Sequence, residues 1–215
     1  MAKAGLGAGK VFLLVAGALI VVFVAATAFG MVPGLSAYLG FAKQKDLGIV
    51  ADKAAFDAGM GKAGIEAEYP ASPVSLGQVT ADGTKRLDAV FTDDEVSAMI
   101  NAYTEPFQYP VSSVQVVFHD GGRSEASAMV TYKGREYPGY IAGTVELAGG
   151  RIGGVATAAN GAGIPAGKYL GEAQDKALQF LNLQLAVPGL VIETAEMSEG
   201  QVKVTGTVPE KIVVK

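Results

Sequence analysis

The sequence predicts an α+β domain carried by one N-terminal transmembrane helix. Residues 11–32 form a long apolar run without charge, which predicts the membrane helix. Residues 114–158 alternate between apolar and polar positions, which indicates consecutive antiparallel strands. Residues 92–103 and 166–185 repeat apolar positions every three or four residues, as amphipathic helices do. Together these patterns predict a curved antiparallel sheet packed with two amphipathic helices.

The apolar run exceeds the roughly 20 residues that a helix needs to cross the hydrocarbon core of a bilayer. Lys3 and Lys10 precede it and no acid occurs before Asp46, so the positive-inside rule places the N-terminus in the cytoplasm. The protein is then a single-pass component of the cytoplasmic membrane with the lipid bilayer as a partner. Its predicted parts are a cytoplasmic tail (1–10), a transmembrane helix (11–32), a juxtamembrane neck (33–73) and an extracytoplasmic α+β domain (74–215).

Two other interpretations of this run stay open. Ala26-Thr27-Ala28 fits a signal-peptide cleavage site, although the apolar core of a signal peptide is usually about 7–15 residues long. The second alternative places the domain on the cytoplasmic side of the membrane, which the positive-inside rule disfavours. Beyond residue 42, 15 Lys and Arg stand against 21 Asp and Glu. This acidic balance gives no basic field for nucleic acid, which we exclude as a partner.

Within the neck, Phe56 and Met60 suggest a short helix that nearby glycines weaken. After a break at 69–73, residues 74–80 predict a first strand. Thr92 and Glu95 then form a capping box, which begins the first amphipathic helix. Four strands of a meander follow, with a hairpin turn at 119–122: they cover 114–118, 125–132, 140–147 and 151–158. The second helix (166–185), a hairpin of strands 190–196 and 201–208, and a short basic tail complete the chain.

Little in the sequence points to catalysis, and no catalytic residue is predicted. The chain has no Cys, and His119 is its only histidine, so thiolate and multi-histidine metal sites are excluded, and we expect no metal and no cofactor. The acids at 93–95 could be read as a metal cluster, but a helix N-terminus explains them more simply. His119 is read as an exposed turn residue without a partner carboxylate. The glycines at 161 and 163 lack the spacing of a phosphate-binding loop.

One apolar set has two interpretations. These residues could line an acyl-chain groove between helix and sheet, because a curved sheet with small inner residues leaves such room. They could equally fill an ordinary core. The candidate ligand-binding residues are Phe107, Tyr109, Met129, Tyr169, Phe180 and Leu181.

Several runs resemble membrane-anchored bacterial extracytoplasmic domains of the tubular lipid-binding (TULIP) type and related phospholipid-binding folds. The runs are DLGI in the neck, FTDDEVSAMINAY at 91–103, the strand meander, IPAGKYLGEAQDKALQFLNLQL from residue 164, and PGLVIETAEMSEGQVKVTGTVPEKI from residue 188. The resemblance implies a long helix packed in a strongly curved sheet, no enzyme activity, and lipid held between helix and sheet. It identifies no binding residue.

We therefore expect a non-enzymatic, membrane-anchored extracytoplasmic protein that binds phospholipid or another apolar ligand. The alternative is an accessory or structural subunit of a membrane protein complex, whose helix packs on transmembrane helices of other membrane proteins. A hydrolase is a third class, but the sequence offers no nucleophile–base pair for it.

Overall fold

The computed structural model describes residues 43–64, 79–104, 111–132, 134–148, 151–161, 164–165 and 191–214. The predicted transmembrane helix at 11–32 and the predicted second helix at 166–185 lie outside these residues. Among the helices that are described, none has the length and apolarity needed to cross a bilayer.

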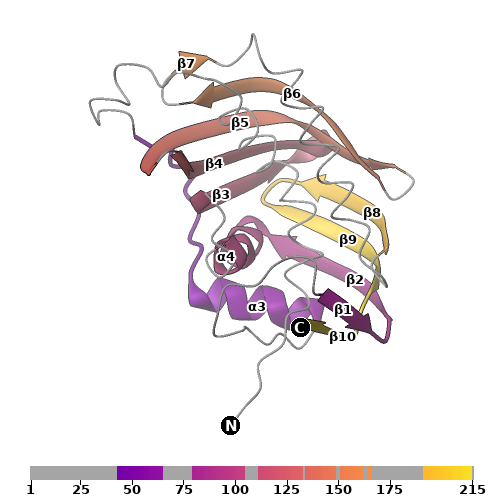
Figure 1. The fold of residues 1–215 in the computed structure, drawn as a ribbon. Coiled ribbons are helices and arrows are strands. Elements are labelled where there is room, and N and C mark those ends of the chain that lie inside the picture. The colour runs from indigo at the N-terminus through magenta and orange to yellow at the C-terminus, as the bar shows by residue number, and fades with distance from the viewer. Residues whose placement is uncertain are drawn as a thin grey trace.

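The described residues form an α+β fold built mostly of antiparallel strands (Figure 1). A five-stranded sheet has the order β3-β4-β5-β6-β7, a three-stranded sheet has the order β2-β9-β8, and β1 pairs with β10. The helices are α3 (Lys53–Ala63) and α4 (Asp93–Thr104). The strands are β1 (Val79–Asp82), β2 (Lys85–Thr92), β3 (Val111–His119), β4 (Arg123–Tyr132), β5 (Arg135–Ala148), β6 (Arg151–Gly161), β7 (Ile164–Pro165), β8 (Val191–Ser198), β9 (Gln201–Val208) and β10 (Lys211–Val214).

The predicted meander is confirmed, since β3, β4, β5 and β6 pair in sequence order. Close backbone approach explains two of its glycines. A Cβ on Gly143 would lie 2.5 Å from the carbonyl oxygen of Val155, and a Cβ on Gly154 would lie 2.5 Å from that of Thr144. The register of β5 and β6 shifts beside Gly143, and such irregularities bend a sheet. Figure 1 shows β5 and β6 as long, bent strands.

Two parts of the strand prediction need correction. Of the strand predicted at 74–80, residues 74–78 lie outside the described residues, and β1 includes the other two. Residues 85–92 were not expected to be a strand, yet β2 pairs along its whole length with β9. Its inward residues Leu87, Ala89 and Phe91 do alternate with exposed ones, but the exposed Val90 makes the sequence apolar at three consecutive positions and hides this two-residue period. The expected basic tail forms β10, because β1 supplies a partner for its backbone.

The helices begin and end as local chemistry dictates. The side chain of Asp52 accepts a hydrogen bond from the amide of Ala55 at the start of α3, and Gly64 ends that helix in the left-handed conformation with φ of 62°. At α4 the predicted capping box is confirmed. The amide of Thr92 donates to the Glu95 carboxylate at 2.9 Å, and the amide of Glu95 donates to the Thr92 hydroxyl at 3.3 Å.

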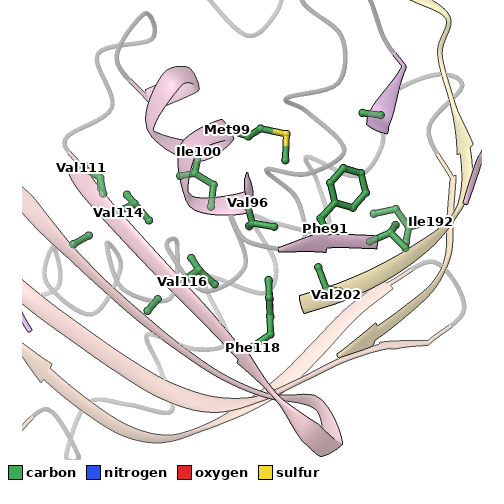
Figure 2. Close-up of a cluster of buried hydrophobic side chains, with 14 of the residues drawn as sticks. Phe91, Val96, Met99, Ile100, Val111, Val114, Val116, Phe118, Ile192 and Val202 are labelled. Atoms are coloured by element: carbon green, nitrogen blue, oxygen red, sulfur yellow. The ribbon is translucent and has the colours of Figure 1, made fainter. Parts of the chain in front are cut away.

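The core lies where α4 packs between the two larger sheets (Figure 2). As predicted, Val96, Met99 and Ile100 form the buried stripe of α4. The alternating strand residues also face this core as expected. They are Val114, Val116 and Phe118 of β3 and Ala126, Ala128 and Val130 of β4. Leu87 and Phe91 of β2, Ile192 of β8, and Val202, Val204 and Val208 of β9 close the core from the second sheet.

We expect Ile100→Ala to lower the free energy of unfolding by about 2–5 kcal/mol, because Ile100 is 0% exposed and its removal leaves a cavity. The measurement is denaturant unfolding of the full chain in detergent, monitored by far-UV circular dichroism. Val155→Thr is the matched control, since Val155 is 59% exposed and this change should cost within about 0.5 kcal/mol. Equal effects of the two substitutions would contradict this description of the core.

Candidate functional site

Three polar side chains of α4 bind the backbone of β3, which is an edge strand of its sheet in the described part. Asn101 pairs with Val114 in both directions: its amide donates to the carbonyl at 2.9 Å, and its oxygen accepts from the backbone amide at 2.7 Å. The Ser97 hydroxyl accepts from the amide of Val116 at 2.9 Å. The Asp93 carboxylate accepts from the amide of Phe118 at 3.0 Å.

These contacts repeat because the two periods match. Asp93, Ser97 and Asn101 are four residues apart, which is a rise of about 6 Å along a helix. Their partners on β3 are two residues apart, which is about 6.7 Å along a strand. We call this set the α4–β3 ladder. It satisfies backbone groups that would otherwise be left unpaired at a buried sheet edge.

The tip of the β8–β9 hairpin docks at one end of this ladder. The amide of Gly200 donates to the carbonyl of Phe118 at 3.0 Å, and the amide of Asp93 donates to the carbonyl of Gly200 at 3.1 Å. The amide of Glu199 donates to the side chain of Asp120 at 3.2 Å. This junction therefore joins α4, the β3–β4 turn and the second sheet.

Beside the junction lies a group of charged and polar side chains that we call the His119 cluster: Lys45, His119, Glu125, Tyr140 and Glu199. The Glu125 carboxylate receives Lys45 Nζ and the Tyr140 hydroxyl, each at 2.6 Å, and His119 Nε2 at 3.2 Å. The other ring nitrogen of His119, Nδ1, lies 3.0 Å from Glu199. The Lys45 ammonium also sits 3.8 Å from the centre of the Tyr140 ring.

Hydrogen bonds hold three members of the cluster, Lys45, Glu125 and Tyr140, in one charge state near neutral pH. The hydrogen bonds from Lys45 and Tyr140 lower the pKa of Glu125 to about 2. Partial burial works against the charge of Lys45, but its hydrogen bonds to Glu125 and Tyr140 outweigh that effect and raise its pKa. Burial and the hydrogen bond to Glu125 raise the pKa of Tyr140. None of these three groups is therefore poised to exchange protons at neutral pH.

Asp93 behaves differently. Burial raises its pKa to about 6, although the hydrogen bond from the Phe118 amide works in the opposite direction. A buried acid with such a pKa can mark a functional site. Here the carboxylate lies in the first turn of α4 and accepts a hydrogen bond from the β3 backbone, so its geometry is that of a structural connector.

The residues at 43–50, which we call the neck segment, lie against the domain. Gln44 donates to the carbonyl of Ser113 at 2.6 Å, and the amide of Leu47 donates to the Gln115 side chain at 2.6 Å. Lys45 binds Glu125, as described above. The amide of Val50 donates to Asp94 at 2.8 Å. The segment is thus attached to β3, β4 and α4.

Ser127 of β4 lies between two strand residues that contact the neck segment. It pairs with Gln115 on one side and with Tyr140 on the other, and both of these neighbours contact the neck segment. Ser127 is 0% exposed, although its strand position is on the face opposite the core residues Ala126 and Ala128. The two residues that flank Ser127 across the sheet therefore both hold the neck segment.

The structure describes one of the six candidate groove residues. Met129 is on β4, half-buried, and strand alternation puts it on the face opposite Ala128 and Val130, away from the core that α4 covers. The other five candidates, Phe107, Tyr109, Tyr169, Phe180 and Leu181, lie outside the described residues. Nothing that is described brings the six together.

The interpretation of His119 as a turn residue without a carboxylate partner is wrong. Its side chain is 24% exposed and contacts Glu125 and Glu199, of which the second is 80 positions away in the sequence. Sequence spacing could not reveal this contact, because it depends on how the β8–β9 hairpin docks. The turn itself, at Asp120–Gly122, is where the sequence placed it.

Among the described residues, no group of three or more His, Cys, Asp or Glu side chains could hold a metal ion. The acids at 93–95 are accounted for individually: Asp93 binds the β3 backbone, Asp94 binds the neck segment, and Glu95 closes the capping box. The His119 cluster has the chemistry of a charged clamp between three segments of the chain.

We expect Glu125→Gln to reduce the dependence of stability on acid pH. The lowered pKa of Glu125 means that its ionised form contributes stability above about pH 4.5, which is lost as the pH falls toward 2. The variant lacks that contribution, so its unfolding free energy should be lower at pH 7 and flatter between pH 4.5 and 2. Denaturant unfolding of the full chain in detergent measures this.

Glu136→Gln is the control, because Glu136 is an exposed acid on the neighbouring strand. An identical loss of unfolding free energy at pH 7 in the two variants would contradict the role of Glu125.

We expect Asp93→Asn to flatten stability over a different pH range. A raised pKa in the folded state means that protonated Asp93 contributes stability below about pH 4, and that this is lost as the pH rises through about 6. Asparagine keeps an oxygen for the Phe118 amide but does not ionise. The same unfolding measurement between pH 4 and 7 tests this prediction. Asp88→Asn is the control, because Asp88 is exposed. If the unfolding free energy of Asp93→Asn changed with pH as steeply as that of the parent protein, the prediction would be refuted.

Comparison of the chain with protein-family models, with curated proteins and with solved structures finds no match. The functional argument therefore rests on the residues of this chain.

Proposed function

We propose that this protein is a non-enzymatic, single-pass membrane protein whose extracytoplasmic domain binds phospholipid or another apolar ligand close to the membrane surface. The observation on which the proposal depends is the attachment of the neck segment. Gln44 and Lys45 already contact the domain, and ten residues, 33–42, separate the neck segment from the predicted membrane helix.

That spacing limits how far the domain can be from the bilayer. Ten extended residues span at most about 35 Å. Because the neck segment is attached at four points, it does not serve as a free tether, and the domain keeps one orientation relative to the point where the chain enters it. A fixed orientation at short range suits a protein that takes its ligand from the bilayer.

The charge distribution supports anchoring by the helix. The part beyond residue 42 has six more acids than bases, so it is not drawn electrostatically to anionic headgroups. Lys45, one of two lysines next to the apolar run, already binds the Glu125 carboxylate and contacts the Tyr140 ring. Attachment to the membrane must then come from the apolar segment.

The inner face of the meander supports an apolar ligand. Residues that pair across neighbouring strands lie on the same face of the sheet. Ser124 pairs with Gly143 and Gly143 with Ala156, and Ala128 pairs with Gly139, so this part of the inner face has only small side chains. The hydroxyl of Ser124 is buried and has no hydrogen-bond partner among the described residues. A ligand with an apolar body and a polar end would supply this hydrogen bond. The resemblance to phospholipid-binding domains points to the same class.

The alternative function is that of a subunit in a membrane protein complex. The observation that favours it is the well-filled core around α4, where Phe91, Val96, Ile100, Val116 and Phe118 are all 0% exposed. A domain with a filled interior needs no ligand and would act through its surface.

We expect phospholipid to co-purify with the full chain after gentle extraction, and to be detected by native mass spectrometry. Ala156→Leu should lower lipid occupancy with little change in melting temperature, because it fills the inner face. Ala158→Leu is the matched control, since Ala158 is exposed on the same strand and should leave occupancy unchanged. A parent protein without lipid but with a stoichiometric membrane-protein partner would refute lipid binding and favour the subunit.

A further inference from the structure

His119 is held between two carboxylates that belong to different parts of the fold. Its Nδ1 is 3.0 Å from Glu199 at the tip of the β8–β9 hairpin, and its Nε2 is 3.2 Å from Glu125 on β4. Ionised carboxylates only accept hydrogen bonds. Both contacts are therefore hydrogen bonds only when both ring nitrogens carry a proton, that is, when His119 is an imidazolium ion.

We propose that His119 is a pH-operated latch that fastens the β8–β9 hairpin to the β3–β4 end of the larger sheet. The latch is closed when the ring is an imidazolium ion and loosens when the ring loses a proton. Neutral imidazole can donate to one carboxylate only, and its bare nitrogen then faces the other. Histidine is the side chain that makes this change between about pH 5 and 8.

Glu199 is the contact that opens. The carboxylate of Glu125 keeps its partners Lys45 and Tyr140 whether or not His119 is charged, and its pKa of about 2 keeps it ionised throughout this range. The Glu199 side chain is 69% exposed and lies on a turn. A neutral His119 therefore stays with Glu125 and releases Glu199.

The surrounding charges act in the same direction. From α4, Asp93 and Asp94 face the junction, and Asp120 lies in the turn beside His119. Arg123 on β4 binds the carbonyl of Asp120 and not a carboxylate. When His119 is neutral, the junction holds several carboxylates without the cation that lies between two of them, and repulsion favours opening.

Asp93 reinforces the latch. Its pKa of about 6 means that it also becomes charged as the pH rises, and its backbone amide is the donor to Gly200. Because a raised pKa in an acid stabilises the folded form at low pH, Asp93 favours a closed junction below about pH 6, which is the same direction as an imidazolium ion at His119. Glu125, with a pKa of about 2, stays ionised between about pH 5 and 8 and does not interfere.

Amide hydrogen exchange on the full chain in nanodiscs, analysed by mass spectrometry, tests the latch. Protection is compared at pH 5.5 and 8 after correction for intrinsic exchange rates. The amides of Glu199 and Gly200 should lose about tenfold or more of their protection at pH 8, as expected for loss of a hydrogen bond to a charged group. The amides of 96–100 in α4 are the internal reference and should not change.

Three variants assign the effect. His119→Gln should show low protection of the hairpin tip at both pH values. In Glu199→Gln the hairpin tip should stay protected at pH 8, because the introduced side-chain amide can donate a hydrogen bond to the unprotonated ring nitrogen of His119. Asp93→Asn should keep a pH dependence due to His119. Since His119 is the only histidine, its single ring signal in NMR reports its charge directly. Hairpin protection that does not change while this signal titrates, or His119→Gln behaving like the parent, would overturn the proposal.

Discussion

The α4–β3 ladder is the constraint on which the rest of the described structure depends. An edge strand presents unpaired backbone groups, and burying them without partners would be costly. Asp93, Ser97 and Asn101 supply those partners from a helix whose rise over four residues nearly equals the rise of β3 over two. This fixes α4 along the sheet edge in one register and places Val96, Met99 and Ile100 in the core.

The junction and the neck segment follow from that placement. Because Asp93 begins α4 at the end of β3, the β8–β9 hairpin can close against both, and Gly200 joins them through its backbone. Glu125 then faces the opposite side of the sheet from the core, where it receives His119 and the neck lysine, Lys45. The acid that links the sheet to the neck segment also holds the histidine that contacts the hairpin. Attachment of the neck segment and docking of the second sheet thus share one carboxylate.

Local signals predicted the local structure well. The capping box at Thr92 and Glu95, the alternation of β3 and β4 and the turn at 120–122 were all readable, because each depends on neighbouring residues. Strand β2 was missed although its burial alternates, because Ala89, Val90 and Phe91 are apolar in succession and its partner β9 is far away in the sequence. The His119 cluster could not be predicted, because residues that contact one another in it are as far as 80 positions apart. The spacing of Asp93, Ser97 and Asn101 was a usable signal: these polar residues recur at intervals of four, and the other residues from 96 to 102 are all apolar.

Residue-resolved amide exchange along β3 tests the ladder most directly. The account predicts that the amides of Val114, Val116 and Phe118 exchange slowly although β3 is an edge strand in the described sheet. It also predicts that Ser97→Ala accelerates exchange at Val116 by about tenfold, the equivalent of one lost hydrogen bond, while Val114 keeps its protection through Asn101. Fast exchange at all three amides in the parent protein, or an unchanged Val116 in Ser97→Ala, would contradict it.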